Sequence, residues 1–190
     1  MNKLDPAHTA VLAMDFQTDI ISRLGDRGPA IVERAASLVA AARAAHAQVI
    51  YIVVGFRPGY PEVSPNNSNF ATIAQSGKFT APPGADIAAA IAPAAGDVIV
   101  QKHRVGAFLG TDLDQILRAQ RIETLVLAGL STSGVVRSTT RYAADADYKL
   151  VIAADACADP DDEVHRVLIE KVLVRQATVC TTADAIAALS

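Results

Sequence analysis

Hydrophobic residues fall into two alternating patterns along the chain: short continuous runs, and longer segments with helical spacing. The continuous runs occupy residues 9–14, 48–54, 97–101, 124–128, 149–154 and 177–180. Such runs are typical of strands buried on both faces of a parallel sheet. Helical spacing is found in residues 29–46, 111–120, 135–147, 159–176 and 182–189. The alternation predicts right-handed βαβ crossovers and a three-layer α/β fold, with a six-stranded parallel sheet between helices.

One long segment breaks this alternation. Residues 55–84 are rich in Gly, Pro, Asn and Ser, and we expect them to be irregular, with a short helix near 86–91. Long irregular segments of compact domains are commonly functional or mobile. We expect Thr111 and Asp159 to cap the helices that follow them. No repeat or linker is visible, so the sequence predicts a single domain over residues 1–190.

Composition narrows the classes of function. Hydrophobic residues make up 51% of the chain, charged residues 19%, and the net charge is −3, with no basic block, so nucleic acid is not expected as a partner. No apolar run approaches the roughly 20 residues of a membrane span. The two cysteines, Cys157 and Cys180, are far apart and fit a reducing compartment. We therefore expect a cytoplasmic protein that acts on a small molecule, without a cofactor or a membrane.

Two charged residues follow predicted strands at their carboxyl ends, where ligands bind in folds of this kind. Asp15 comes directly after the first strand and is a candidate general base; the alternative is a carboxylate that caps the next turn. Lys102 follows the third strand and could keep Asp15 ionised and stabilise developing negative charge. The alternative for Lys102 is a solvated charge at a strand end.

The fourth strand leads through Gly129–Gly134 into a helix, and this turn is the third candidate. The first backbone N–H groups of a helix have no intrahelical partner and attract anions. Ser131, Thr132 and Ser133 place hydroxyl groups there, most simply as helix caps. The turn does not have the GxSxG pattern of serine hydrolases.

Three further residues are candidates for substrate binding. Arg57 follows the second strand, and its guanidinium could hold a substrate carboxylate, although a surface position is equally compatible. Gln17 lies two residues after Asp15. Phe108 could line a pocket, the alternative being core packing. The four histidines are scattered, without metal-ligand spacing, and no metal site is predicted.

The sequence around these candidate residues resembles the isochorismatase-like hydrolase superfamily, also called the cysteine hydrolases. The resemblance extends over almost the whole chain, through AVLAMDFQ around Asp15, KHRVGAF from Lys102, LVLAGLST before the turn, Ser138-Thr139 with Ala143, and VIAADACA around Asp155. The resemblance implies a Rossmann-like, six-stranded parallel sheet and a homo-oligomer, either a dimer or a tetramer. It also implies a cis peptide bond between Leu130 and Ser131.

Many members of that superfamily use an Asp-Lys-Cys triad. By resemblance, Asp15 and Lys102 are the first two members, and Val135 stands where the nucleophilic cysteine is expected. The turn formed by Leu130, Ser131, Ser133 and Gly134 is expected to direct backbone N–H groups at an oxyanion. The histidine-rich metal motif of the nicotinamidases is absent from the matching residues 54–59.

A valine has no nucleophilic atom, so thioester chemistry is not available at position 135. Three hypotheses follow. The chain is a hydrolase that relies on Asp15 and Lys102 for acid–base chemistry on a small, carboxylate-bearing molecule. Alternatively, it is an inactive relative that binds a small ligand or serves as an assembly subunit. A weaker alternative uses Ser131 or Ser133 as the nucleophile, provided that its hydroxyl reaches Asp15 or Lys102.

Overall fold

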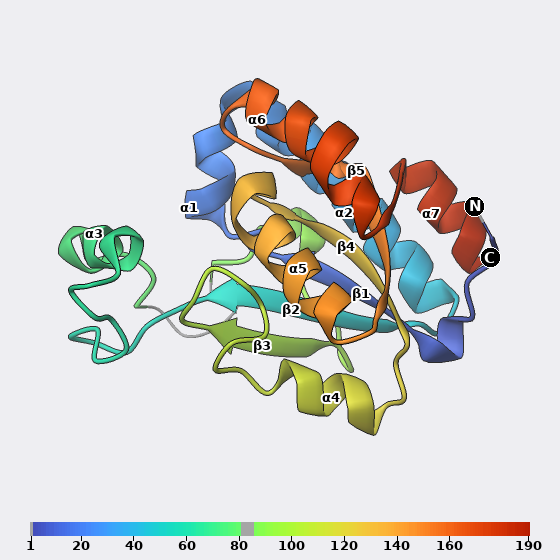
Figure 1. Cartoon of the computed structure of the whole chain (residues 1–190), viewed down its shortest axis with the longest axis horizontal. Coiled ribbons are helices and arrows are strands. Elements are labelled where there is room, and N and C mark those ends of the chain that lie inside the picture. Colours follow the sequence, from blue (N-terminus) through green and yellow to red (C-terminus); the bar gives the residue numbers. More distant parts are fainter. Residues whose placement is uncertain (1, 81–85) are drawn as a thin grey trace.

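The computed structural model of the chain describes residues 2–80 and 86–190 (Figure 1). It contains one six-stranded sheet, in the order β3-β2-β1-β4-β5-β6, in which every neighbouring pair is parallel. The strands are β1 (Thr9–Met14), β2 (Gln48–Val54), β3 (Val98–Lys102), β4 (Thr124–Leu130), β5 (Lys149–Ala158) and β6 (Thr178–Cys180). The predicted α/β fold with a six-stranded parallel sheet is confirmed.

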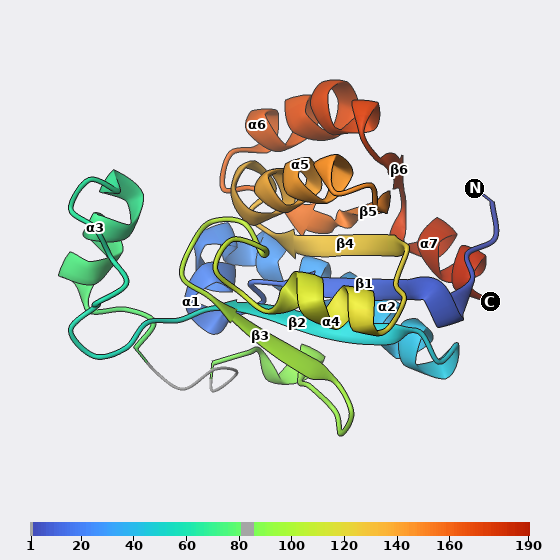
Figure 2. The same ribbon diagram turned by 60° about the horizontal axis from the view of Figure 1, so that its bottom comes forward.

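Helices cover both faces of the sheet (Figure 2). The α-helices are α1 (Thr18–Ile21), α2 (Gly28–Ala44), α3 (Ser68–Ser76), α4 (Leu113–Ala119), α5 (Arg137–Asp145), α6 (Asp162–Val167) and α7 (Thr182–Leu189). Shorter 3₁₀ or π turns are η1 (Pro6–His8), η2 (Ser22–Arg27), η3 (Ala89–Ile91), η4 (Thr132–Val136), η5 (Leu168–Val172) and η6 (Leu173–Arg175). In the described part of the chain, no helix combines the length and the apolar character that a membrane crossing requires.

Two hydrophobic cores lie on opposite faces of the sheet. Val11 and Ala13 of β1 face the core under α2 and α7, whereas Leu12 and Met14 face the core under α4 and α5. This alternation follows from the period of two residues in a strand, and burial on both faces explains why β1 is apolar at every position. The hydrophobic runs of the sequence therefore mark the strands of the sheet.

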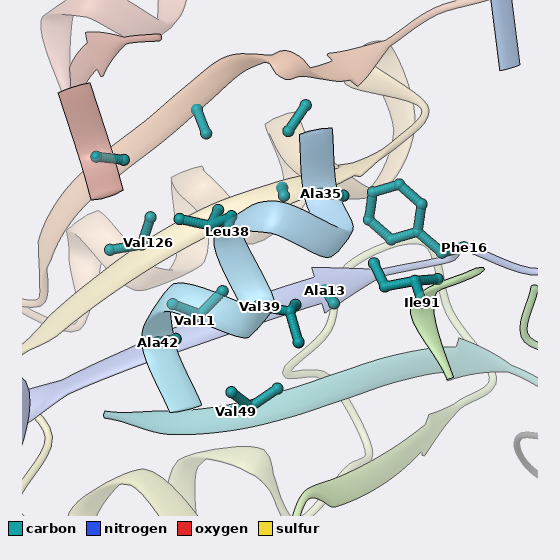
Figure 3. Close-up of a cluster of buried hydrophobic side chains, with 14 of the residues drawn as sticks. Val11, Ala13, Phe16, Ala35, Leu38, Val39, Ala42, Val49, Ile91 and Val126 are labelled. Atoms are coloured by element: carbon teal, nitrogen blue, oxygen red, sulfur yellow. The ribbon is translucent and has the colours of Figure 1, made fainter. Parts of the chain in front are cut away.

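The longest helix, α2, lies across the middle of one face. Leu38, Val39 and Ala42 project from it toward Val11 of β1 and Val126 of β4 (Figure 3). The small side chains of this alanine-rich helix let it approach the sheet closely, in the same core as side chains of β1 and β4. These are the two strands whose ends carry Asp15 and the turn.

Several boundaries differ from those expected from the sequence. The segment 55–84 contains a helix, α3, capped by Asn67, whose side chain accepts a hydrogen bond from the amide of Phe70; residues 81–84 lie outside the described part. The expected helix near 86–91 is limited to the single turn η3. Strand β5 continues to Ala158, because after a register shift its end pairs with β4, Cys157 opposite Gly129 and Ala158 opposite Leu130.

Both predicted caps lie before the residues that occupy the cap positions. Asp112 is at the cap position of α4 but makes no capping hydrogen bond, whereas the hydroxyl of Thr111 accepts from the amide of Leu113, the first residue of the helix, and donates to the carbonyl of Ala107. Asp161 caps α6, where its side chain accepts from the amides of Glu163 and Val164. Asp159 is thereby free for a different contact, described below.

Candidate functional site

A cavity of about 360 Å³ opens at the carboxyl ends of β1, β3 and β4. These ends meet where the strand order reverses, because β1 pairs with both β2 and β4. The polar side chains that line the cavity are those of Asp15, Arg23, Asn69, Lys102, Ser131, Ser133 and Arg137. The structure thus brings together the three candidates from the sequence: Asp15, Lys102 and the turn after β4.

Asp15 sits at the bend that ends β1. Its φ is 61°, in the left-handed region that aspartate tolerates better than most residues, and its amide donates to the carbonyl of Ile52 over 2.8 Å. Its Oδ2 lies 3.0 Å from Nζ of Lys102. Its Oδ1 is buried without a hydrogen-bond partner among the described residues. One carboxylate oxygen is therefore used by the protein and the other is available.

Burial raises the pKa of the Asp15 carboxyl above its usual value, because the charged form loses its hydration. The ammonium of Lys102 acts in the opposite direction, through its charge and its hydrogen bond, and compensates only in part. Asp15 consequently holds a proton more tightly than an exposed aspartate would. Such a shifted carboxyl in a cavity is typical of groups that exchange protons with a ligand.

Lys102 is the last residue of β3, and its side chain is almost completely buried. Its Nζ lies 3.3 Å from the carbonyl oxygen of Arg104, to which it donates in addition to contacting Asp15. A buried ammonium with a fixed carboxylate partner differs from the solvated strand-end charge that was the alternative. The ammonium is positioned to stabilise negative charge in the cavity.

The turn after β4 begins with a cis peptide bond between Leu130 and Ser131, which confirms the prediction. A π turn, η4, follows directly and leads into α5. The amide of Ser133 donates to Oδ2 of Asp159 over 2.7 Å, and the amide of Gly134 donates to Oγ of Ser131 over 3.1 Å. These two N–H groups are satisfied within the protein, contrary to the expectation that the turn presents them to an oxyanion.

Gly129 brings the end of β4 close to β1. A Cβ atom at this position would lie 2.9 Å from Cβ and 3.0 Å from the carbonyl oxygen of Met14. Because the backbone of Met14 cannot move without displacing Asp15, only glycine allows this approach. The requirement explains the glycine at the end of an otherwise bulky strand.

Two residues that the sequence did not indicate support the turn. Asp159, which is buried, accepts from Ser133, and Nδ1 of His165 lies 2.8 Å from the hydroxyl oxygen of Thr132. Arg27 binds the same segment, since its guanidinium donates to the carbonyls of Asp159 and Pro160. In the sequence, Asp159 has the pattern of a helix cap and His165 lies on a helix, so neither residue signals this role.

Val135 lines the cavity, and no cysteine does so among the described residues. Cys157 is buried in β5, where its Sγ lies 3.9 Å from the carbonyl oxygen of Leu127, and burial raises the pKa of its thiol to about 12. Cys180 lies in β6, at the edge of the sheet. A thiolate nucleophile is thus not available from either cysteine in this arrangement.

The predicted substrate-binding residues Gln17, Arg57 and Phe108 do not line the described cavity. The side chain of Gln17 is bound to the backbone of Val54 and to the carboxylate of Asp86. Arg57 is exposed and pairs with Glu62. Phe108 stacks on the ring of Tyr142, with centroids 4.5 Å apart. Each of these side chains has a structural partner that the linear sequence does not reveal.

Two arginines occupy the cavity instead. Arg23 lies in η2 and Arg137 is the first residue of α5. Both arginines lie a short distance after a strand end: Arg23 in the segment after β1, and Arg137 directly after the turn that follows β4. This position is the sequence signal that could have indicated them as cavity residues. Within the described ranges, no group of three or more His, Cys, Asp or Glu side chains is arranged to hold a metal ion.

The serine alternative can be compared with these contacts. Lys102 contacts Asp15 and the carbonyl of Arg104, and Oγ of Ser131 accepts from the amide of Gly134. No hydrogen bond joins the hydroxyl of Ser131 or Ser133 to Asp15 or Lys102 in the described structure. The contact that a serine nucleophile requires is therefore not formed.

The comparisons with known proteins agree with the fold. The profile of the isochorismatase domain matches residues 9–184. The isochorismatase family protein YecD of Escherichia coli O157:H7 is 33% identical, over all of both chains. The ureidoacrylate amidohydrolase RutB of Methylobacterium radiotolerans is 31% identical, over 89% of this chain and 74% of that protein. The crystal structure of a cysteine hydrolase from Pseudomonas syringae superposes with a TM-score of 0.89, at 27% identity, covering 100% of this chain and 95% of the other. The chain therefore belongs to the isochorismatase family of hydrolases.

Proposed function

We propose that the protein hydrolyses a small, carboxylate-bearing molecule by acid–base chemistry, without a covalent intermediate on the enzyme. The observation that carries the proposal is the buried pair of Asp15 and Lys102, in which Oδ1 of Asp15 is unpartnered and available to a ligand in the cavity. The names of relatives such as ureidoacrylate amidohydrolase support a hydrolytic reaction on a small acid.

In the proposed reaction, Asp15 accepts a proton from a water molecule in the cavity through Oδ1. The water oxygen bonds to the electrophilic carbon of the substrate, and Lys102 stabilises the negative charge that develops on the substrate oxygen. Asp15 then returns the proton to the leaving group as its bond to carbon breaks. The raised pKa of Asp15 suits this exchange. Its carboxylate is a stronger base than that of an exposed aspartate, and its pKa lies closer to neutral pH.

Val135 explains why we propose water as the nucleophile. We place Val135 at the position of the cysteine that other members use, and it lines the same cavity as Asp15 and Lys102. A direct attack by water needs no side-chain nucleophile, and the apolar methyl groups of Val135 leave the charged pair as the reactive part of the cavity.

The test is a screen of amides, ureides, esters and vinyl ethers of small carboxylic acids with the purified full chain. We expect turnover in at least one class, reduced at least 100-fold by Asp15→Asn, which is the usual contribution of a general acid–base. Asp145→Asn, an exposed residue at the end of α5, is the matched control and should not change the rate. Unchanged turnover in Asp15→Asn would overturn the assignment, and absence of turnover in every class, with ligand binding intact, would favour the binding-only alternative.

The predicted homo-oligomer, a dimer or a tetramer, and the cytoplasmic location stay predictions. The exposed side chains of Leu109 and of Tyr142, which stacks on the buried Phe108 ring, support an association through this surface. Light scattering coupled to size exclusion would measure the mass in solution, and a monomer at micromolar concentration would contradict the expected oligomer.

A further inference from the structure

The ionisable side chains that line the cavity do not balance in charge. They are Asp15, Lys102, Arg23 and Arg137, and the first two form an ion pair with each other. Two arginines remain, so the cavity has an excess of positive charge within a chain whose net charge is −3. A concentration of one sign of charge in a cavity attracts ligands of the opposite sign.

The side chain of neither arginine forms a hydrogen bond or an ion pair with another residue in the described part of the chain. This distinguishes them from Arg27, which binds Asp159 and Pro160, and from Arg57, which pairs with Glu62. In Arg27 and Arg57, a carboxylate or carbonyl partner occupies guanidinium donors. The absence of one leaves the guanidinium donors of Arg23 and Arg137 available to a ligand.

The two arginines and the acid–base pair lie at different depths. Arg23 and Arg137 are exposed, whereas Asp15 and Lys102 are buried. The walls between them include the apolar side chains of Val54, Phe70, Ile73, Phe79, Leu130 and Val135. A cavity of about 360 Å³ with these walls accommodates a small molecule with an apolar body, an anionic end at the mouth and a reactive end at the base.

From this geometry we infer that Arg23 and Arg137 are specificity-determining residues that bind the carboxylate of the substrate at the cavity mouth. The guanidinium group offers paired donors that match the two oxygens of a carboxylate. The inference deepens the proposed function, on which it rests for the identity of the reactive end. The recognition of the anion itself requires no turnover and can be measured separately.

The experiment compares small acids with their neutral amides, since the two members of a pair differ little in shape. The probes are the pairs acetate and acetamide, succinamate and succinamide, adipamate and adipamide, and benzoate and benzamide, titrated calorimetrically into the full chain at low salt. We expect at least one acid to bind about tenfold more tightly than its amide, as charge-assisted hydrogen bonds imply. Raising the salt concentration should reduce the difference.

Variants assign the preference to the two arginines. Arg23→Gln and Arg137→Gln should each weaken the preferred acid about tenfold, leave the affinity for its amide unchanged and retain the wild-type melting temperature. Arg137→Lys, which keeps the charge without the paired donors, should retain an intermediate affinity. Arg141→Gln is the matched control, because Arg141 is exposed on the same helix but does not line the cavity.

Two outcomes would overturn the inference: equal or undetectable binding of acid and amide in all pairs, or an acid preference that survives both glutamine variants. The results also separate this inference from the proposed function. An arginine-dependent preference for the acid without any hydrolysis contradicts only the hydrolase. Hydrolysis that depends on Asp15 but is unaffected by the arginine variants contradicts only the carboxylate recognition.

Discussion

The imidazole of His165 and the hydroxyl of Thr132 lie 2.8 Å apart and join α6 to the turn after β4. Burial lowers the pKa of His165, while Asp159 and Asp162 raise it and Arg27 lowers it further. Thr132 itself is completely buried in the turn that lines the cavity. The protonation state of one histidine is thus linked to the structure around the candidate active site.

This linkage predicts a loss of stability in mild acid. Because the pKa of His165 is lower in the fold than in the unfolded chain, the unfolded chain binds more protons below about pH 6.5. The melting temperature should therefore fall as the pH is lowered from 7 toward 5. In His165→Asn, which retains a hydrogen-bonding group near the position of Nδ1 but does not titrate there, this part of the dependence should be lost. His46→Asn, at an exposed site, is the control, and an equal effect of both variants would contradict the prediction.

Asp159 should stabilise the turn through Ser133. Asp159→Ala leaves the Ser133 amide without its acceptor, at a cost of about 1–3 kcal/mol in the free energy of unfolding, and should also weaken ligand binding. Asp159→Asn, whose carbonyl oxygen can still accept, should restore most of both. Asp161→Ala removes only the cap of α6, so it should cost about 1 kcal/mol without changing affinity. Urea unfolding and calorimetry measure the two effects, and a loss of affinity in Asp161→Ala equal to that in Asp159→Ala would refute a specific role.

The pair formed by Asp15 and Lys102 should show strong coupling in a double-mutant cycle. Asp15→Asn leaves a buried ammonium without a counter-charge, and Lys102→Met leaves a buried carboxylate, so each should destabilise the fold by about 3 kcal/mol. The double variant should be more stable than either single variant, because no isolated charge remains. Additive losses in urea unfolding would contradict this coupling.

The Lys102→Met variant should also depend on pH. Lys102 lowers the pKa of Asp15, so its removal raises a pKa that burial has already raised. A carboxyl with a higher pKa in the fold binds more protons there than in the unfolded chain, and stability falls as the pH rises through that pKa. The deficit of Lys102→Met relative to the wild type should therefore shrink as the pH is lowered. The double variant, which has no carboxyl at position 15, should lack this effect.

Val135→Cys should create a reactive thiol in the cavity. The ammonium of Lys102 in the same cavity should lower the pKa of such a thiol, so iodoacetamide should label it at neutral pH faster than the thiol of Val136→Cys, a position that does not line the cavity. Background labelling comes from Cys180 and is measured in the wild type. Cys157, with its pKa near 12, should react only after unfolding. Equal labelling of the two variants, both folded, would contradict the position assigned to Val135.

The fold and part of the site could be predicted from the sequence. Strands buried on both faces leave continuous apolar runs, and Asp15 and Lys102 are recognisable because each follows such a run. The confirmed family resemblance adds the cis bond before Ser131. Position relative to a strand end is a local property, so it can be read from a linear sequence.

The contacts between distant segments could not be predicted in the same way. Arg57 has the position of a substrate ligand, but Glu62 pairs with it, and Gln17 is held by Val54 and Asp86. Arg23 and Arg137 come from distant segments, η2 and α5, and only the fold brings both to the same cavity. Tertiary packing decides which arginine has a side-chain partner. The sequence pattern alone does not reveal these pairs.

Helix α3 supplies one wall of the cavity through Asn69, Phe70 and Ile73, and in both views it stands apart from the sheet (Figures 1 and 2). Its hydrophobic contacts belong to a small third cluster of Val54, Phe56, Phe70 and Phe79, separate from the two cores of the sheet. A small cluster opens at a lower free energy than the whole domain. Backbone amides of residues 68–76 should consequently exchange with deuterium through a subglobal opening, while those of β1 and β4 exchange only on complete unfolding. The cavity wall formed by α3 can therefore open at a lower free energy than the sheet needs to unfold.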